Sequence, residues 1–184
     1  MLIKIIGLFR ALVMRPFFFK IGFPTYICKP ISIYRPRRIS VGKKVRIQPG
    51  VRMEAHDNGR IEIHDDVSIG QNFHITSGGN ENLIVGAKTT ILGNVFITNI
   101  DHEYREIGRH IMEQPFIVNK TEIGDNCFIG YGACIQAGTI LGKQCIVGAN
   151  AVVRGVFPDY CVIVGVPAKV IKKYNFETKK WERV

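Results

Sequence analysis

His102 and the carboxylates on either side of it are the residues whose types and spacing best suit catalysis. The chain has five histidines: His56, His64, His74, His102 and His110. The last two lie in a polar, charged segment over residues 101–120. An imidazole, with an ordinary pKa of about 6.5, takes up a proton near neutral pH and so suits a general base. Asp101 or Glu103 can hold such a ring in one tautomer, and a main-chain carbonyl can do the same.

The net charge of +10 over 184 residues predicts an anionic partner: a nucleic acid, a membrane surface or a phosphorylated ligand. Nucleic acid ranks last because no aromatic-basic recognition motif accompanies the charge, and we expect none to bind. The five cysteines show no metal-type spacing, so we expect reduced thiols, a cytoplasmic protein and no metal.

A six-residue repeat must position these groups. Aliphatic residues recur at intervals of six: Ile123, Ile129, Ile135, Leu141, Val147 and Val153. Gly follows four of them, and the position four residues after each of the first five is small. A helix of 3.6 residues per turn would scatter these positions around its axis, and a plain strand would alternate by two. The period therefore predicts a short strand and a corner, repeated, with one large aliphatic per face pointing inward.

The same triplets extend back to Val41, with longer gaps after every third repeat. Met53 to Ile63 and Ile75 to Val85 are each ten residues, and Ile97 to Ile123 is twenty-six. All insertions should therefore emerge at one corner of a prism, which is how solenoids commonly build a binding edge. The twenty-residue insertion, residues 101–120, is uncommon in a compact solenoid unless it is functional.

Residues 1–20 are mostly apolar, with single basic residues at intervals. They predict a helix in which Ile5, Phe9, Leu12 and Val13 share one face. Pro16 should end it, because the residue before a proline is biased away from helix. The segment is too often interrupted by charge to span a bilayer and lacks a signal-peptide cleavage site. It either packs as a cap on the first coil or lies on anionic lipid at the membrane surface, and the two roles are compatible.

The flanks of the repeat are less regular. Residues 21–40 contain Pro24, Pro30 and Pro36 and only a blurred repeat, so we expect an irregular lead into the regular coils, which run over residues 41–164. Residues 161–164 should add a final strand, and residues 166–174 a helix that closes the open end of the stack. We thus expect one domain, 1–184, with residues 165–184 as C-terminal cap and tail.

The run from Gly165 to Ile171, GVPAKVI, together with IGDNCFIG and the repeats, resembles the hexapeptide-repeat acetyltransferases over about residues 41–173. This resemblance implies an all-β fold, a left-handed parallel β-helix with three repeats per coil. It also implies acetyl-CoA as co-substrate and a homotrimer whose active sites lie between subunits. The position of His102 points to the bacterial enzymes that O-acetylate sugars and surface polysaccharides.

The resemblance assigns roles to particular residues. It makes His102 the general base, with Asp101 as the orienting carboxylate, and gives the backbone N–H of Tyr131 to the oxyanion. Lys169 and Lys172 fall where the family places basic residues near the CoA phosphates. The cofactor-binding set as a whole is Phe128, Tyr131, Ala149, Arg154, Gly155, Lys169 and Lys172.

For the acceptor we expect a sugar held by side chains stacked along the edge that carries His102: Asn72, His74, Asn80 and Asn82. Galactoside-type relatives use an Asn and an Asp where this chain has Gly70 and Gly78–Gly79, which argues against a simple galactoside. The expected function is O-acetylation of a sugar in O-antigen or capsule biosynthesis, peripheral to the cytoplasmic membrane through residues 1–20.

Three alternatives remain open. The first is N-acetylation of a nucleotide-linked amino sugar, which needs similar base chemistry. The second is a metalloenzyme like the γ-type carbonic anhydrases, for which the histidine spacings fit poorly. The third is a non-catalytic β-helix scaffold.

Overall fold

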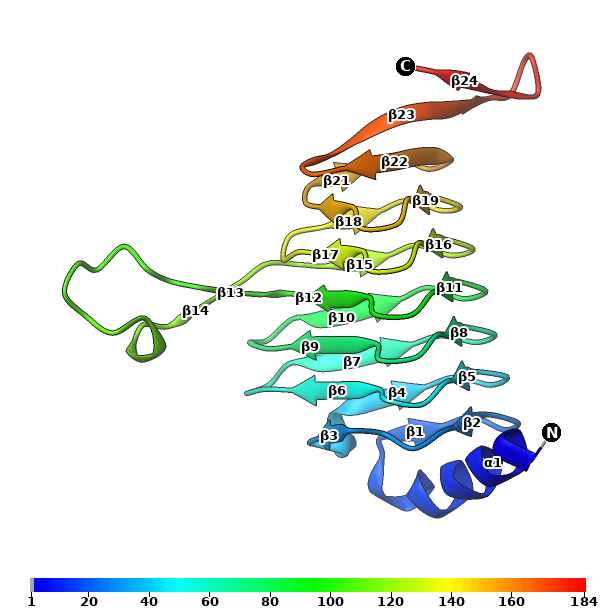
Figure 1. The fold of residues 1–184 in the computed structure, drawn as a ribbon. Coiled ribbons are helices and arrows are strands. Elements are labelled where there is room, and N and C mark those ends of the chain that lie inside the picture. Colours follow the sequence, from blue (N-terminus) through cyan, green and yellow to red (C-terminus); the bar gives the residue numbers. More distant parts are fainter. Residues whose placement is uncertain (1) are drawn as a thin grey trace.

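The computed structural model describes residues 2–184 as a three-sided stack of short strands with one helix at its N-terminal end (Figure 1). Each coil takes one strand from each of three parallel sheets in turn. Hydrogen-bonded neighbours come from successive coils, which lie about 4.8 Å apart as in any sheet. This confirms the short strands and corners that the period of six predicts, and the all-β, parallel β-helical architecture that the resemblance implies.

The strands of each face follow in chain order. The first sheet contains β1 (Lys20–Ile21), β4 (Ile39–Val41), β7 (Arg60–Ile63), β10 (Asn82–Val85), β15 (Glu122–Ile123), β18 (Ile140–Leu141) and β21 (Val156–Phe157). The second contains β2 (Tyr26–Ile27), β5 (Arg46–Ile47), β8 (Ser68–Ile69), β11 (Thr90–Ile91), β16 (Phe128–Ile129), β19 (Ile146–Val147), β22 (Cys161–Gly165), β23 (Ala168–Asn175) and β24 (Lys180–Arg183). The third contains β3 (Ser32–Tyr34), β6 (Arg52–Ala55), β9 (His74–Ser77), β12 (Phe96–Thr98), β17 (Cys134–Ile135) and β20 (Val152–Val153).

The repeated aliphatics fill the interior, as the sequence predicts. Ile129 is fully buried and stacks in register between Ile91 of the coil before and Val147 of the coil after. Gly follows these aliphatics because the next coil passes close by. A Cβ on Gly130 would lie only 2.6 Å from the backbone nitrogen of Ala149, which no side chain can tolerate.

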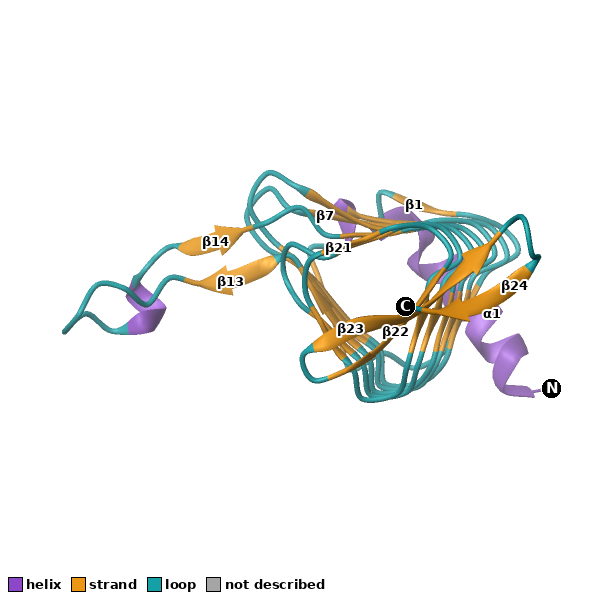
Figure 2. Ribbon diagram, turned by 90° about the horizontal axis from the view of Figure 1, so that it is seen from above, coloured by secondary structure: helices purple, strands orange, loops and turns teal. Residues whose placement is uncertain are grey.

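All the insertions emerge at one edge of the prism, between a third-sheet strand and the first-sheet strand of the next coil. We call it the insertion edge; it comprises residues 35–38, 56–59, 78–81 and 99–121, and higher in the stack 136–139 and 154–155. The longest insertion folds into an antiparallel hairpin of β13 (Ile100–His102) and β14 (Phe116–Val118), with a 3-10 turn, η3 (Ile111–Glu113), near its tip. Figure 2 shows this hairpin projecting from the prism.

Helix α1 (Leu2–Met14) packs against β2 at the N-terminal end of the stack, followed by the 3-10 turn η1 (Arg15–Phe17), so the predicted stop at Pro16 is confirmed. Its buried residues are Gly7 and Ala11, and Arg10 donates a hydrogen bond to the Ile27 carbonyl. The helix therefore caps the first coil through small residues. No helix in residues 2–184 has the length and apolar character needed to cross a membrane.

The expected irregular lead over residues 21–40 is wrong. These residues form a complete first coil, β1 to β3, followed by a 3-10 turn, η2 (Pro36–Arg38). Ile21, Ile27 and Ile33 lie in its three strands and keep the period of six. Pro24 and Pro30 fall between strands, where the missing N–H removes nothing from the ladder.

The expected C-terminal helix over residues 166–174 is also wrong. β23 instead pairs antiparallel with β22, and β24 pairs antiparallel with β23. Burial along β23 alternates with a period of two, which suits a strand. A helix here would leave the outer N–H and C=O groups of β22 without partners, whereas the hairpin pairs them.

Candidate functional site

His102 ends β13 and lies opposite Phe116 of β14, where the hairpin leaves the insertion edge. The two rings meet edge to face, with centroids 5.0 Å apart, and the imidazole is exposed. The hairpin base is fixed by the buried Asn99, whose side chain exchanges hydrogen bonds with the backbone of Gly78. Gln114 ties the outer loop together through Glu106 and Arg109. His102 is thus carried on an ordered support.

A cavity of about 370 Å³ lies between the hairpin and the outer face of the third sheet. Its size is that of a small-ligand site. His102 lines it, together with side chains from the coils toward the N-terminus and from the hairpin: His56, Thr76, Phe96, Met112 and Phe116. Mixed aromatic and hydrogen-bonding side chains beside a potential base suit a polar organic acceptor such as a sugar.

A second cavity, of about 480 Å³, shares His102 and Asp101 with the first and includes Arg154 from a later coil. Arg105 and Tyr104 of the hairpin also line it. Its two guanidinium groups can donate to the phosphates of an anionic ligand, although each is paired with a carboxylate, Arg154 with Asp101 and Arg105 with Glu103. His102 therefore lies where two cavities of different chemistry meet.

The carboxylates beside His102 are engaged elsewhere. Asp101 Oδ2 lies 3.0 Å from Arg154 Nη2, so this predicted catalytic carboxylate is an ion-pair partner of a predicted cofactor residue. Glu103 accepts hydrogen bonds from the Arg105 side chain and from the backbone N–H groups of Arg105 and Tyr104, which lowers the pKa of Glu103 to about 2. These contacts do not support Asp101 as the group that orients the imidazole.

The predicted cofactor residues divide between two edges and one face of the prism. Arg154 and Gly155 lie at the insertion edge, beside the hairpin. Phe128 points outward from the second sheet, and Tyr131 and Ala149 lie at the corner between the second and third sheets. Lys169 and Lys172 are on β23, opposite Val164 and Val162 of β22. They do not form one site on a single prism.

Tyr131 is one strand length from the His102 edge, roughly 15 Å across the third sheet. Its hydroxyl accepts a hydrogen bond from the Asn94 side chain. The predicted oxyanion role of the Tyr131 backbone N–H stays a prediction, and it requires the corner of one prism to face the hairpin of another.

Of the four predicted acceptor residues, only Asn80 lies at the insertion edge, where it accepts a hydrogen bond from Asn58. The prediction that all four share that edge is wrong for the others. Asn72 lies at the opposite corner in a ladder with Asn94, and its left-handed backbone (φ 54°) indicates a turn role. Asn82 points out from the first sheet and donates to Glu62.

His74 lies on β9, on the outer face of the third sheet and two strands from β17. Its ring centroid is 5.0 Å from that of Phe96 on the neighbouring strand, β12. Burial lowers the pKa of His74, although the Glu54 carboxylate 3.5 Å away opposes the shift. Its Nε2 is 2.9 Å from Thr76 Oγ1. His74 therefore supports Thr76 and Phe96, which line the first cavity, and is not itself a lining residue.

The sequence reasoning missed most of that first cavity. Thr76 and Phe96 occupy positions directly after and before the inward aliphatics Ile75 and Ile97, and these neighbours point outward. His56 is the first residue of its insertion. Sequence position thus indicates which side chains face outward, but the direction of the hairpin decides which of them enclose a cavity.

Comparison with known proteins agrees with this fold. The family model described as the hexapeptide repeat of succinyl-transferase matches residues 120–154. A putative lipopolysaccharide biosynthesis O-acetyl transferase of Escherichia coli, WbbJ, is 42% identical over 113 residues, covering 56% of each chain. The galactoside O-acetyltransferase of the same organism is 28% identical over 98 residues, covering 53% of this chain and 47% of its own. The chain thus spans about half the length of these curated relatives.

Among solved structures, a mutant of AntD, an N-acyltransferase from Bacillus cereus, superposes with a TM-score of 0.76 at 20% identity, covering 92% of this chain and 90% of that one. That structure contains coenzyme A and dTDP-4-amino-4,6-dideoxyglucose. A maltose O-acetyltransferase from Clostridium difficile superposes less closely, with a TM-score of 0.51. At these identities the similarity shows the fold. Repeat, relatives and architecture agree that the chain has the left-handed β-helix fold of these acyltransferases.

Proposed function

We propose that this chain is an acetyl-CoA-dependent O-acetyltransferase that acetylates a hydroxyl of a sugar in cell-surface polysaccharide biosynthesis. The observation that carries the proposal is the position of His102, which lines both cavities. One cavity suits a polar acceptor and the other an anionic donor. Similarity to the putative O-acetyl transferase of E. coli supports the choice of a sugar hydroxyl.

In this proposal, the imidazole of His102 takes the proton of the acceptor hydroxyl as its oxygen attacks the thioester carbonyl. An alcohol is a weak nucleophile at neutral pH, so proton removal must accompany attack. The tetrahedral intermediate then expels the CoA sulfur, the carbon–sulfur bond breaks, and the thiolate takes the proton from the His102 imidazolium, which restores the base. The products are the acetyl ester and free CoA. A fixed backbone N–H at a coil corner, such as that of Tyr131, stabilises the oxyanion.

Donor binding uses residues from two prisms. On a single chain, Arg154 lies at the insertion edge, whereas Phe128, Tyr131 and Ala149 lie around the second sheet and its far corner. A homotrimer with parallel prisms would place the hairpin of one copy against the second-sheet corner of the next. Gly155 leaves room beside Arg154, while Lys169 and Lys172 supply positive charge for the phosphates.

Binding of acetyl-CoA is the first test of this function. Calorimetry on the purified protein, with its mass in solution measured alongside, should show micromolar binding at about one site per chain in a trimer. Lys169→Ala should weaken that binding severalfold, most at low ionic strength, because the contact is a point charge on a phosphate. A folded trimer that binds no acetyl-CoA would refute the donor half of the proposal. A panel of hydroxyl sugars and nucleotide-linked amino sugars then separates O- from N-acetylation.

Asp101→Asn should leave kcat within about threefold of the wild type, since the carboxylate contacts Arg154 and not the imidazole. The KM for acetyl-CoA should fall, because the change releases a guanidinium in the donor cavity. Thermal stability should not change measurably, as partly exposed ion pairs contribute about 0–1 kcal/mol. Steady-state kinetics at several pH values check this. A fall in kcat of more than 100-fold with KM unchanged would restore Asp101 as the orienting group.

A further inference from the structure

The outer face of α1 is apolar and exposed. Six residues at helical spacing form this stripe, with exposures between 45% and 71%: Leu2, Ile5, Ile6, Phe9, Leu12 and Val13. A surface helix normally turns its apolar stripe toward the core. Here Gly7 and Ala11 make the core contact instead, so the larger apolar side chains of the predicted stripe point away from the protein.

Aromatic residues extend this stripe beyond the helix. Phe17 and Phe19, in the segment that joins α1 to the first coil, are 60% and 66% exposed. So much exposed apolar surface at one end of the molecule indicates an interaction site. We call the six stripe residues together with Phe17 and Phe19 the N-terminal face.

The part of the chain that forms this face carries charge of one sign. Residues 1–53 contain twelve Lys and Arg residues and no Asp or Glu, and the first acidic residue of the chain is Glu54. Lys4, Arg15 and Lys20 lie in or directly after α1 and η1. Apolar surface surrounded by basic side chains complements an interface that offers hydrocarbon below a layer of anionic groups.

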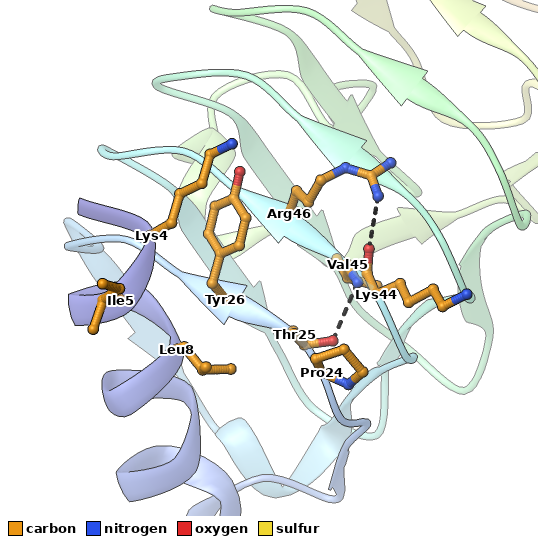
Figure 3. A pocket seen from close by; sticks show the side chains of 9 residues that line it. All are labelled: Lys4, Ile5, Leu8, Pro24, Thr25, Tyr26, Lys44, Val45 and Arg46. Atoms are coloured by element: carbon orange, nitrogen blue, oxygen red, sulfur yellow. Dashed lines mark hydrogen bonds between the residues drawn. The ribbon is translucent and has the colours of Figure 1, made fainter. Parts of the chain in front are cut away.

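A groove beside the helix has the same character. It measures about 470 Å³ between α1 and strands β2 and β5, with Ile5, Leu8, Pro24 and Tyr26 among its lining residues. Figure 3 shows the Tyr26 ring standing between Lys4 on α1 and Arg46 on β5. Arg46 is paired with Asp66, so the positive charge at the rim comes mainly from Lys4 and Lys44.

We propose that the N-terminal face docks on an anionic phospholipid bilayer, with lipid headgroup phosphates at Lys4 and Lys44. The stripe residues enter the interfacial region, and the groove accommodates part of a lipid. α1 lies at the end of the stack, so the prism stands on the membrane with its coils above it (Figure 1). This inference does not depend on the proposed acyl transfer.

Docking also limits the position of the candidate site. The coil that leads into the His102 hairpin is the fourth, three spacings above the first coil, or roughly 15 Å. If the proposed function holds, an acceptor sugar carried on a membrane lipid would reach the first cavity without leaving the bilayer surface.

Co-sedimentation with vesicles tests the docking. The full-length protein should sediment with vesicles of phosphatidylcholine and phosphatidylglycerol and stay in the supernatant with phosphatidylcholine alone. Replacing two stripe residues, Phe9→Gln with Leu12→Gln, should weaken binding about tenfold or more through lost apolar burial. Lys4→Gln with Lys44→Gln should weaken vesicle binding by about fivefold per charge. Adding 0.5 M salt to the wild type should also weaken vesicle binding, because it screens the same charges.

Matched controls keep the result specific. Ile107→Gln changes a 94% exposed apolar residue at the hairpin tip, and Lys143→Gln with Lys180→Gln removes two exposed charges far from α1. Both should bind vesicles as the wild type does. The proposal is overturned if the wild type sediments with neither kind of vesicle. It is also overturned if the Phe9 and Leu12 variant binds vesicles as well as the wild type does. A smaller mass in solution for that variant overturns it too, because the face would then be an interface between copies of this chain.

Discussion

His102→Ala should lower kcat by about 100- to 10,000-fold, the range that a positioned general base contributes. Affinity for acetyl-CoA should stay within about twofold of the wild type, because the imidazole removes a proton and does not hold the donor. The melting temperature should not change, since the side chain is exposed and packs only edge to face with the Phe116 ring. Steady-state kinetics, calorimetry and thermal unfolding on one preparation check all three.

His110→Ala is the matched control for this experiment. His110 lies in the same hairpin, where its ring accepts a hydrogen bond from the backbone N–H of Met112 at the start of η3. It lines neither cavity that contains His102. The control should retain kcat within a few fold. If His102→Ala instead weakens acetyl-CoA binding by 100-fold or more while kcat at saturation is kept, His102 is a binding residue and the proposed mechanism fails.

The period of six made the prism predictable because one backbone geometry satisfies it. Each aliphatic side chain, such as that of Ile135 or Leu141, points inward only if the chain turns a corner after it. Counting residues in sixes therefore locates both the interior side chains and the corners. The gaps after Met53, Ile75 and Ile97 then had to fall at one edge, and the structure places them there. The position of His102 on that edge follows from the same count.

Residue-level placement failed where it depended on more than the coil number. Asn72 and His74 belong to one coil, but a corner separates them, so they lie on different parts of the prism. Asn82 is the first residue of the next strand, β10, and therefore faces out from another sheet. Contiguity along the chain had suggested a shared edge, although each corner turns the chain to a new face.

The structure at the two ends of the stack depends on tertiary contacts that cannot be predicted from the sequence alone. The apolar stripe that includes Phe9 and Leu12 correctly indicated a helix. Its apolar character also suggested that this stripe packs against the first coil, but the helix makes that contact through Gly7 instead. At the other end, residues 168–175 have mixed propensity. The open edge of β22 decides their structure by offering backbone partners. Likewise, the direction of the hairpin sets the cavities around His102.

Ile129→Asp should cause the largest loss of stability among simple changes, because it places a carboxylate in the fully apolar interior between Ile91 and Val147. No partner for the charge lies among those neighbours. Burying it, or protonating it, together with the lost aliphatic packing costs about 4 kcal/mol or more. Domains are stable by about 5–15 kcal/mol, so most of the margin is consumed. We expect insoluble protein or a melting temperature lower by at least about 10 °C.

Phe128→Asp is the control for the alternation that this prediction assumes. Phe128 and Ile129 are the two residues of β16, but the Phe128 side chain is 42% exposed on the outer face. Its change to Asp should cost little stability, because a charge there remains in water. Ile129→Ala gives a measurable intermediate of about 2–5 kcal/mol if the Asp variant does not fold. Equal melting temperatures for Ile129→Asp and the wild type would mean that the repeated aliphatics do not form the interior, and the whole register of the β-helix would be wrong.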